Sequence, residues 1–391
     1  MGAIQMFQTE PIFYLQSHLN HCFTNYMIQI TQMGYPSLIV PIIVLAIFGV
    51  DFKKGFLLLQ LFLWTDLVTT TLKILVEYPR PYYVDKKVIN LENNATNTSH
   101  CGDKKVINLE NNTTSTSLFS GNGIKDIFAL PDNQILKTFH LQEACKLSSL
   151  GFPSGHVSLT TVLWEGIATV YNSRLIRILT PFAIVLMAFS RVYLGKHFIG
   201  DVFGGLIVGL ISLGVFKYFL KSPLKRDFFK KESFELVLRR QNLIFYCFMF
   251  IIPIILIILS LVRLQPLNPC NIADLFGMVG PIFGMNIAYL LIIRKGIPDS
   301  IGSTEQRATR AFIAFLLFEV SKIILETCFC IGQIGDHYLC TMAEKTTYPP
   351  FAFLKCALIG FLKTFIPVFT IWVSVVICTK LNLYRKNEES L

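Results

Sequence analysis

A histidine and an aspartate four residues apart are the most chemically suggestive pair in this chain. They lie in residues 190–201, which read Ser-Arg-Val-Tyr-Leu-Gly-Lys-His-Phe-Ile-Gly-Asp. If a helix begins at His197, the Asp201 carboxylate lies one turn away on the same face and reaches the imidazole. A carboxylate bonded to one ring nitrogen fixes the tautomer and leaves the other nitrogen as a nucleophile or base. A surface hydrogen bond or a helix cap has the same spacing, so the pair needs partners elsewhere.

Two other polar clusters precede this run. Residues 151–156 read Gly-Phe-Pro-Ser-Gly-His, in which Ser154 is a candidate N-cap and Gly155 allows a ligand to approach backbone N–H groups. Helix N-termini bind anions through free N–H groups and the helix dipole, although an ordinary helix start beside an incidental histidine has the same sequence. Upstream, Lys73 lies close to the end of an apolar segment, where a lysine can also serve as an interfacial anchor, and Arg80 follows that segment.

The composition places these clusters in a membrane protein. The chain is 53% hydrophobic and only 15% charged, whereas a soluble domain is about 25% charged. Nine segments are mainly apolar and most approach the roughly 20 residues that span a bilayer: residues 38–50, 56–76, 157–171, 175–189, 199–220, 243–262, 272–293, 311–331 and 351–378. We therefore predict an all-α fold, a polytopic membrane bundle of about nine transmembrane helices.

The basic residues predict how the bundle is oriented. Most loop lysines and arginines fall in connections that nine spans place on one side, residues 51–55, 172–177, 221–242, 294–310 and the tail from residue 379. The positive-inside rule assigns that side to the cytosol. The N-terminus, residues 77–156 and residues 190–198 then face the outside or a lumen. The net charge of +10 follows this topology and does not indicate a nucleic-acid partner.

The same pattern divides the chain into regions. We expect an N-terminal extracytosolic segment (1–36), a catalytic membrane core (37–220), a basic cytosolic loop (221–242), and a C-terminal four-helix membrane region with a cytosolic tail (243–391). Residues 85–94 recur as residues 103–112 without a periodic apolar face, so residues 85–120 are predicted to be a flexible low-complexity insertion. Its sequons are possible glycosylation sites in a eukaryotic host, at Asn94, Asn97, Asn111 and Asn112.

This topology brings the three clusters to one membrane face. Lys73, Arg80 and Arg191 offer three cations for the non-bridging oxygens of a phosphoryl group. Ser154 and Gly155 add hydroxyl and backbone donors. Phosphoryl transfer depends mainly on such charge placement around an in-line displacement. The clusters contain no set of carboxylates and histidines suited to a metal, so we expect neither a metal nor another cofactor.

The three clusters together resemble the signature motifs of the type 2 phosphatidic acid phosphatase superfamily. The matching patterns are Lys73-x6-Arg80-Pro81, Pro153-Ser-Gly-His156 and Ser190-Arg191-x5-His197-x3-Asp201. The resemblance implies metal-independent hydrolysis of a phosphate monoester or diphosphate through a phosphohistidine. It implies that His197 is the nucleophile, Asp201 its orienting partner and His156 the acid for the leaving oxygen. The implied phosphate-binding residues are Lys73, Arg80, Ser154, Gly155 and Arg191.

The sequence resembles two branches of this superfamily. Nine spans and the pair Tyr82-Tyr83 are similar to glucose-6-phosphatase, which would make the substrate a sugar phosphate. Asp201 and the run Tyr78-Pro79-Arg80-Pro81 are more similar to lipid phosphatases, including the sphingosine-1-phosphate phosphatases, and favour a lipid phosphate. The expected membrane is the endoplasmic reticulum in a eukaryote or the plasma membrane in a bacterium. Membrane lipids are the expected surroundings, and the oligomeric state stays open.

A different class of function also fits part of the sequence. Glu319, Lys322 and Glu326 lie at helical spacing within the eighth apolar segment. Transporters and membrane enzymes both have charged residues inside membrane segments, so these residues do not distinguish the two classes. If the chain is not an enzyme, the alternative is therefore a transporter or a catalytically inactive membrane scaffold.

Overall fold

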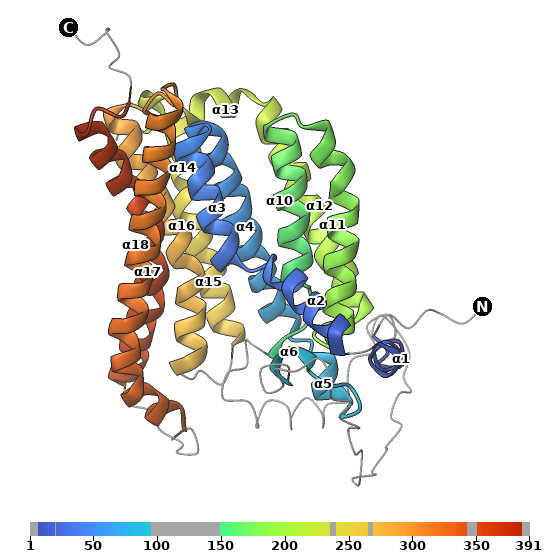
Figure 1. Cartoon of the computed structure of the whole chain (residues 1–391). Coiled ribbons are helices and arrows are strands. Elements are labelled where there is room, and N and C mark those ends of the chain that lie inside the picture. Colours follow the sequence, from blue (N-terminus) through green and yellow to red (C-terminus); the bar gives the residue numbers. More distant parts are fainter. Residues whose placement is uncertain are drawn as a thin grey trace, which may run out of the picture.

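The computed structural model describes residues 7–19, 21–94, 149–234, 240–264, 269–341 and 350–384. In this part of the chain, long helices run side by side as a bundle, and short helices pack across one end (Figure 1). The only strand-like pairing within it is an isolated bridge between Pro79 and Leu150. The predicted all-α fold is confirmed for the described residues.

Five helices form the predicted catalytic core, and two of them begin at a residue whose side chain caps the helix. The helix that starts after Asp51 is capped by its carboxylate, which accepts a hydrogen bond from the Lys54 N–H at 2.9 Å. Ser173 caps a later helix by accepting from the Ile176 N–H at 3.4 Å. The five helices are α3 (Pro36–Gly49), α4 (Phe52–Val76), α10 (Gly155–Val170), α11 (Arg174–Tyr193) and α12 (Ile199–Lys221).

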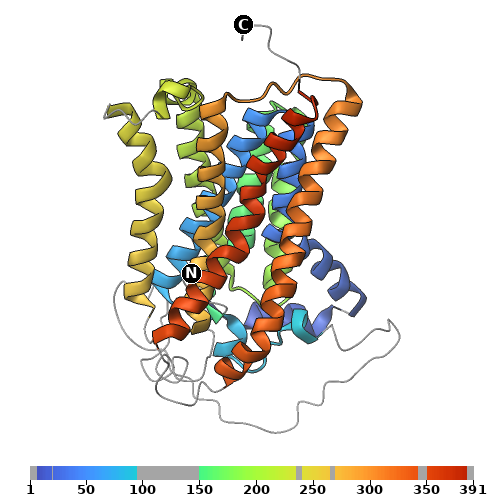
Figure 2. The ribbon, with the colours of Figure 1, turned by 90° about the vertical axis from the view of Figure 1, so that its left-hand side faces the viewer.

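The C-terminal region adds further long helices beside this core. A helix with a π-helical turn combines α14 (Arg240–Tyr246), η3 (Cys247–Ile251) and α15 (Ile252–Arg263). It is followed by α16 (Pro269–Lys295), α17 (Thr304–Thr341) and α18 (Pro350–Lys380). In Figure 2, α18 crosses between α16 and α17 and packs on both, while α17 also packs along α3.

The predicted count of nine spans is not confirmed. Six described helices are long and apolar enough to cross a membrane: Phe52–Val76, Arg174–Tyr193, Ile199–Lys221, Leu243–Arg263, Asn271–Lys295 and Phe351–Lys380. A seventh span results if two helices bent by 49°, Phe23–Gln32 and Pro36–Gly49, cross together. The apolar segment at 157–171 became α10, which has only 16 residues. At about 1.5 Å per residue such a helix is shorter than a bilayer core.

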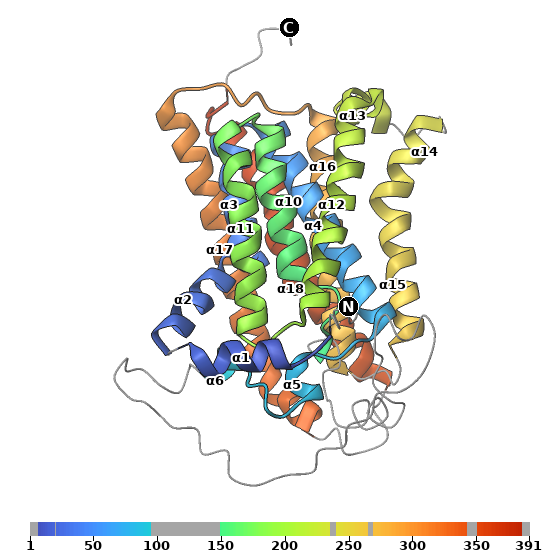
Figure 3. The same ribbon diagram turned by 90° about the vertical axis from the view of Figure 1, so that its right-hand side faces the viewer.

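Short helices gather at one end of the bundle. They are α1 (Glu10–His18), α2 (His21–Gln32), α5 (Pro81–Val84) and α6 (Leu91–Asn94). Figure 3 shows them at the end opposite α13 (Pro223–Phe228), which belongs to the basic loop. The bundle therefore has one end built from the N-terminal segment and the start of the insertion, and one end that carries basic residues.

The first copy of the duplicated sequence is packed, in contrast to the flexible insertion expected from its polarity. The Thr9 hydroxyl donates to the Asp85 carboxylate at 2.9 Å, and the Gln16 side chain bonds both the N–H and the carbonyl of Ile89 at 3.0 and 2.8 Å. Val88 is buried. Polar bonds hold this segment in place, and it has no periodic apolar face from which its packing could be predicted. Asn94 ends α6, whereas Asn97, Asn111, Asn112 and the rest of the insertion lie outside the described residues.

Glycines on α12 allow it to pack closely on α10. A Cβ atom on Gly205 would overlap the carbonyl oxygen of Ser154, and one on Gly209 would lie 2.8 Å from the Cβ of Thr161. Such approaches are possible only without a side chain at these two positions. The contact at Gly205 matters most for the site, because Ser154 is the residue from which α10 begins.

We predict that Gly205→Ala destabilises the protein by about 1–3 kcal/mol, because an added methyl group overpacks the contact with Ser154. The measurement is thermal unfolding of purified protein in detergent. Gly214→Ala is the matched control on the same helix, because its added Cβ meets no described atom within 4 Å. Its effect should be neutral or stabilising by up to about 1 kcal/mol, from helix propensity alone. Equal melting temperatures for the two variants would contradict the proposed packing constraint.

Candidate active site

The first and second motifs are joined by a short stretch of paired backbone. The helix α4 ends after Lys73, and Glu77 turns the chain with a φ of 54°. The Gly151 N–H then donates to the Tyr78 carbonyl at 2.6 Å, and the Arg80 N–H donates to the Ser149 carbonyl at 3.1 Å. The Lys73 ammonium lies 3.4 Å from the Gly151 carbonyl oxygen. This pairing places the residues after α4 beside those that lead into α10.

The second and third motifs are joined through the backbone of Asp201. The Ser154 N–H donates to the Asp201 carbonyl at 2.9 Å, at the point where α10 begins. A Cβ atom on Gly151 would lie 2.8 Å from an Asp201 carboxylate oxygen, so only glycine permits this approach. A Cβ atom on Gly155 would lie 3.9 Å from the Lys73 Cε. The start of α10 is thus adjacent to both Lys73 and Asp201.

The histidine–aspartate pair has the geometry expected from its spacing. The His197 Nδ1 lies 3.3 Å from the Asp201 Oδ2, and the two side chains are 1% and 0% exposed. The same carboxylate oxygen accepts a hydrogen bond from the Phe198 N–H at 2.9 Å, and the His197 N–H donates to the Arg191 carbonyl at 3.3 Å. Two backbone bonds and the carboxylate therefore fix the position of the ring.

The electrostatic environment of His197 favours its neutral form. Burial, reinforced by the charges of Lys73, Arg80 and Arg191, lowers the pKa of His197 well below its usual value. With the Nδ1 proton assigned toward Asp201, the Nε2 atom keeps its lone pair. A neutral, oriented imidazole is the form that attacks phosphorus.

Several motif residues present buried polar atoms without a hydrogen-bond partner in the described chain. Within that part, the unpaired atoms include Arg80 Nε, Ser154 Oγ, His156 Nε2 and Arg191 Nε. Buried polar atoms are nearly always bonded, and leaving one unpaired costs about 1–3 kcal/mol. Such atoms from all three motifs fit an anion with several acceptor oxygens, as a phosphoryl group has. Three of these residues, Arg80, Ser154 and Arg191, are among the predicted phosphate-binding residues, and His156 is the predicted acid.

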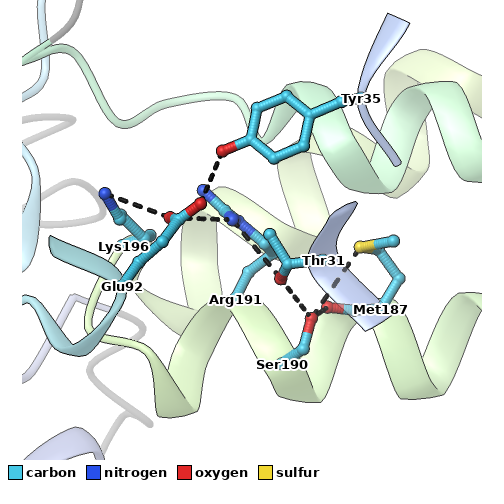
Figure 4. Close-up of polar contacts among 7 residues, drawn as sticks. All are labelled: Thr31, Tyr35, Glu92, Met187, Ser190, Arg191 and Lys196. Atoms are coloured by element: carbon cyan, nitrogen blue, oxygen red, sulfur yellow. Dashed lines mark hydrogen bonds and ion pairs between the residues drawn. The ribbon is translucent and has the colours of Figure 1, made fainter. Parts of the chain in front are cut away.

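The structure also brings four residues to Arg191 that the sequence did not single out. Figure 4 shows Thr31, Tyr35, Glu92 and Lys196 around the guanidinium. Arg191, which is 2% exposed, donates from Nη1 to the Thr31 hydroxyl at 3.4 Å and lies 3.6 Å from a Glu92 carboxylate oxygen. That oxygen is 3.1 Å from the Lys196 ammonium.

Tyr35 connects this cluster to the second motif. Its hydroxyl donates to the other Glu92 oxygen at 2.6 Å, and its ring packs on the edge of His156 with centroids 4.5 Å apart. Of the four added residues, only Lys196 had a sequence signal, because it precedes His197. Thr31 and Tyr35 lie far upstream in the predicted N-terminal segment, and Glu92 lies in the duplicated sequence.

The apolar helices and the site at one end of them support a multi-pass membrane protein. Residues 54–225 match the family model of the PAP2 superfamily. Phosphatidylglycerophosphatase B of Bacillus subtilis (strain 168) is 35% identical over 81 residues, a match that covers 18% of this chain and 40% of that relative. No solved structure matches the chain at a significant level. Residues 54–225, just under half of the chain, are therefore similar to the PAP2 superfamily, as the three motifs indicated.

We predict that vanadate, which mimics a five-coordinate phosphoryl group, raises the melting temperature of the wild-type protein by binding the folded site. Ser154→Ala should weaken that binding by about tenfold or more, because a buried hydroxyl facing a charged ligand is lost. Thermal unfolding over a vanadate titration measures both. The control is Lys217→Met, since Lys217 pairs with Glu165 at 2.8 Å away from the motifs. An unchanged vanadate affinity in Ser154→Ala would contradict the assignment of this hydroxyl to the phosphate site.

Proposed function

We propose that this chain is a metal-independent membrane phosphatase that acts on a lipid phosphate through a phosphohistidine intermediate. The proposal rests on one observation: His197 is buried and oriented, and all three motifs contribute buried polar atoms without a partner in the described chain. These groups supply a nucleophile and a binding site for phosphoryl oxygens without further cofactors.

The first step forms a bond between His197 Nε2 and phosphorus and breaks the phosphorus–oxygen bond to the leaving group. Asp201 stabilises the imidazole because it holds the Nδ1 proton as the ring acquires positive charge. His156, as an imidazolium stabilised by the negative charge of the bound phosphate, gives its proton to the leaving oxygen and becomes neutral. In the second step, water attacks phosphorus, the proton that it loses passes to His156, and the nitrogen–phosphorus bond breaks to release inorganic phosphate.

The cations of the three motifs stabilise the charge on the phosphoryl oxygens. Lys73, Arg80 and Arg191 surround the same site from three separate elements, and the N-terminus of α10 adds backbone donors at Gly155. Because these groups are held by backbone pairing before substrate binds, little reorganisation is needed in the transition state.

Two observations support a lipid substrate over a soluble sugar phosphate. The motif residues lie at or beside the ends of α4, α10, α11 and α12, and the short helices α5 and α6 pack at that end (Figure 1). We expect a headgroup at the membrane interface to enter the site there. The relative from Bacillus subtilis carries the name phosphatidylglycerophosphatase B. We further propose that this end is lumenal or extracytosolic, because the basic segment around α13 lies at the other end.

We predict that His197→Ala lowers phosphate release by at least about 1,000-fold, because no other group replaces the nucleophile. Release of inorganic phosphate from purified protein measures this loss. Melting temperature and gel-filtration profile serve as the check on folding, and Lys217→Met is again the activity control. Substantial turnover by a folded His197→Ala protein would exclude His197 as the nucleophile.

A substrate panel in EDTA separates the functions that the sequence left open. We expect release from phosphatidate and sphingoid-base phosphate to persist in EDTA and to exceed release from glucose 6-phosphate. A preference for glucose 6-phosphate would favour the sugar phosphatase, and loss of activity in EDTA would contradict the metal-independent mechanism. Substrate flux into proteoliposomes without phosphate release would instead identify a transporter.

A further inference from the structure

A carboxylate sits inside the predicted phosphate-binding site, which is unexpected for a site that must attract an anion. Glu92 is 17% exposed and lies between Arg191 and Lys196 (Figure 4). Burial would raise the pKa of its carboxyl, but the charges of Arg191 and Lys196 and the bond from Tyr35 hold that pKa below its usual range. Glu92 is therefore a fixed negative charge at this edge of the site.

Glu92 contacts the Nη1 atom of Arg191 and leaves the Nε atom for substrate. Its carboxylate and Thr31 contact the Nη1 atom, whereas Nε is buried without a partner in the described chain. Glu92 therefore does not fill the phosphoryl site. Glu92 instead neutralises part of the positive charge of Arg191 and Lys196, which would otherwise attract a second anionic group.

Tyr35 links Glu92 to the side of the site that holds His156. Tyr35 packs on His156, the proposed donor of a proton to the leaving oxygen, and the same tyrosine donates its hydroxyl to Glu92. In a monoester the leaving group is an alcohol, which carries no charge once it is protonated. In a diphosphate the leaving group is itself a phosphate, whose negative charge would be repelled by a carboxylate beside this path.

We propose that Glu92 is a specificity-determining residue that selects phosphate monoesters over diphosphates, by placing a negative charge where the leaving phosphate of a diphosphate would lie. The inference rests on the proposed phosphatase function and narrows its substrate class. It assigns a role to the first copy of the duplicated sequence, which holds Glu92 through the bonds of Asp85 and Ile89 to the N-terminal helix.

The test compares two lipids with the same acyl chains, phosphatidate and diacylglycerol diphosphate. Glu92→Gln keeps the shape and the acceptor for Tyr35 but removes the charge. We expect it to raise the ratio of kcat/KM for diphosphate to that for monoester by about tenfold or more. The ratio is independent of the fraction of active protein, so a purely structural defect does not change it.

Two further variants test whether the effect is specific to the charge of Glu92. Glu10→Gln removes one negative charge from an exposed position on α1, the helix that bonds the same segment through Gln16, and should leave the ratio unchanged. Lys196→Gln removes a cation that compensates Glu92, and should lower the ratio. Inhibition by methylenediphosphonate, relative to inorganic phosphate, should strengthen in Glu92→Gln by a similar factor.

The possible failures are distinct. Active wild-type protein with the same ratio in Glu92→Gln and Lys196→Gln would overturn the role of Glu92 and leave the phosphatase intact. A rise in the ratio of equal size in Glu10→Gln would also overturn it, because the effect would then come from the net charge at this end of the protein. Absence of phosphate release from both lipids by wild-type protein would overturn the proposed function itself.

Discussion

The arrangement of the site depends on Asp201 more than on any other single residue. Its carbonyl accepts the Ser154 N–H, and its carboxylate accepts the Phe198 N–H and lies beside the His197 ring. Both of these carboxylate contacts are made by Oδ2, which is how a buried carboxylate is stabilised, whereas Oδ1 is buried without a partner in the described chain. One residue therefore couples the start of α10, the start of α12 and the orientation of the proposed nucleophile, so these features cannot vary independently.

Much of the helical framework could be predicted because it follows from local composition. The apolar run at 199–220 became Ile199–Lys221, and the run at 272–293 became Pro269–Lys295. The motif residues lie at helix ends or in adjacent loops, so a correct order of helices was enough to bring them together. The span count was harder to predict, since α10 is apolar but only 16 residues long and is packed inside the bundle.

The missed part of the site has a common physical origin. Thr31, Tyr35 and Glu92 reach Arg191 through contacts between segments far apart in sequence, and neither periodicity nor a motif marks such contacts. The polarity of the duplicated sequence favoured a loop that was free of the core. Instead, polar side chains such as Gln16 bond directly to its backbone, which is a long-range form of order that composition does not reveal.

The duplication has a consequence for how this loop changes during evolution. Residues 103–112 are identical to residues 85–94, and Glu92, which lies beside Arg191, belongs to the first copy. Slippage of the gene that adds or removes whole copies after Asn94 leaves the residues next to the site unchanged. The number of copies after Asn94 can therefore change while Glu92 and the bonds of Asp85 and Ile89 stay as they are.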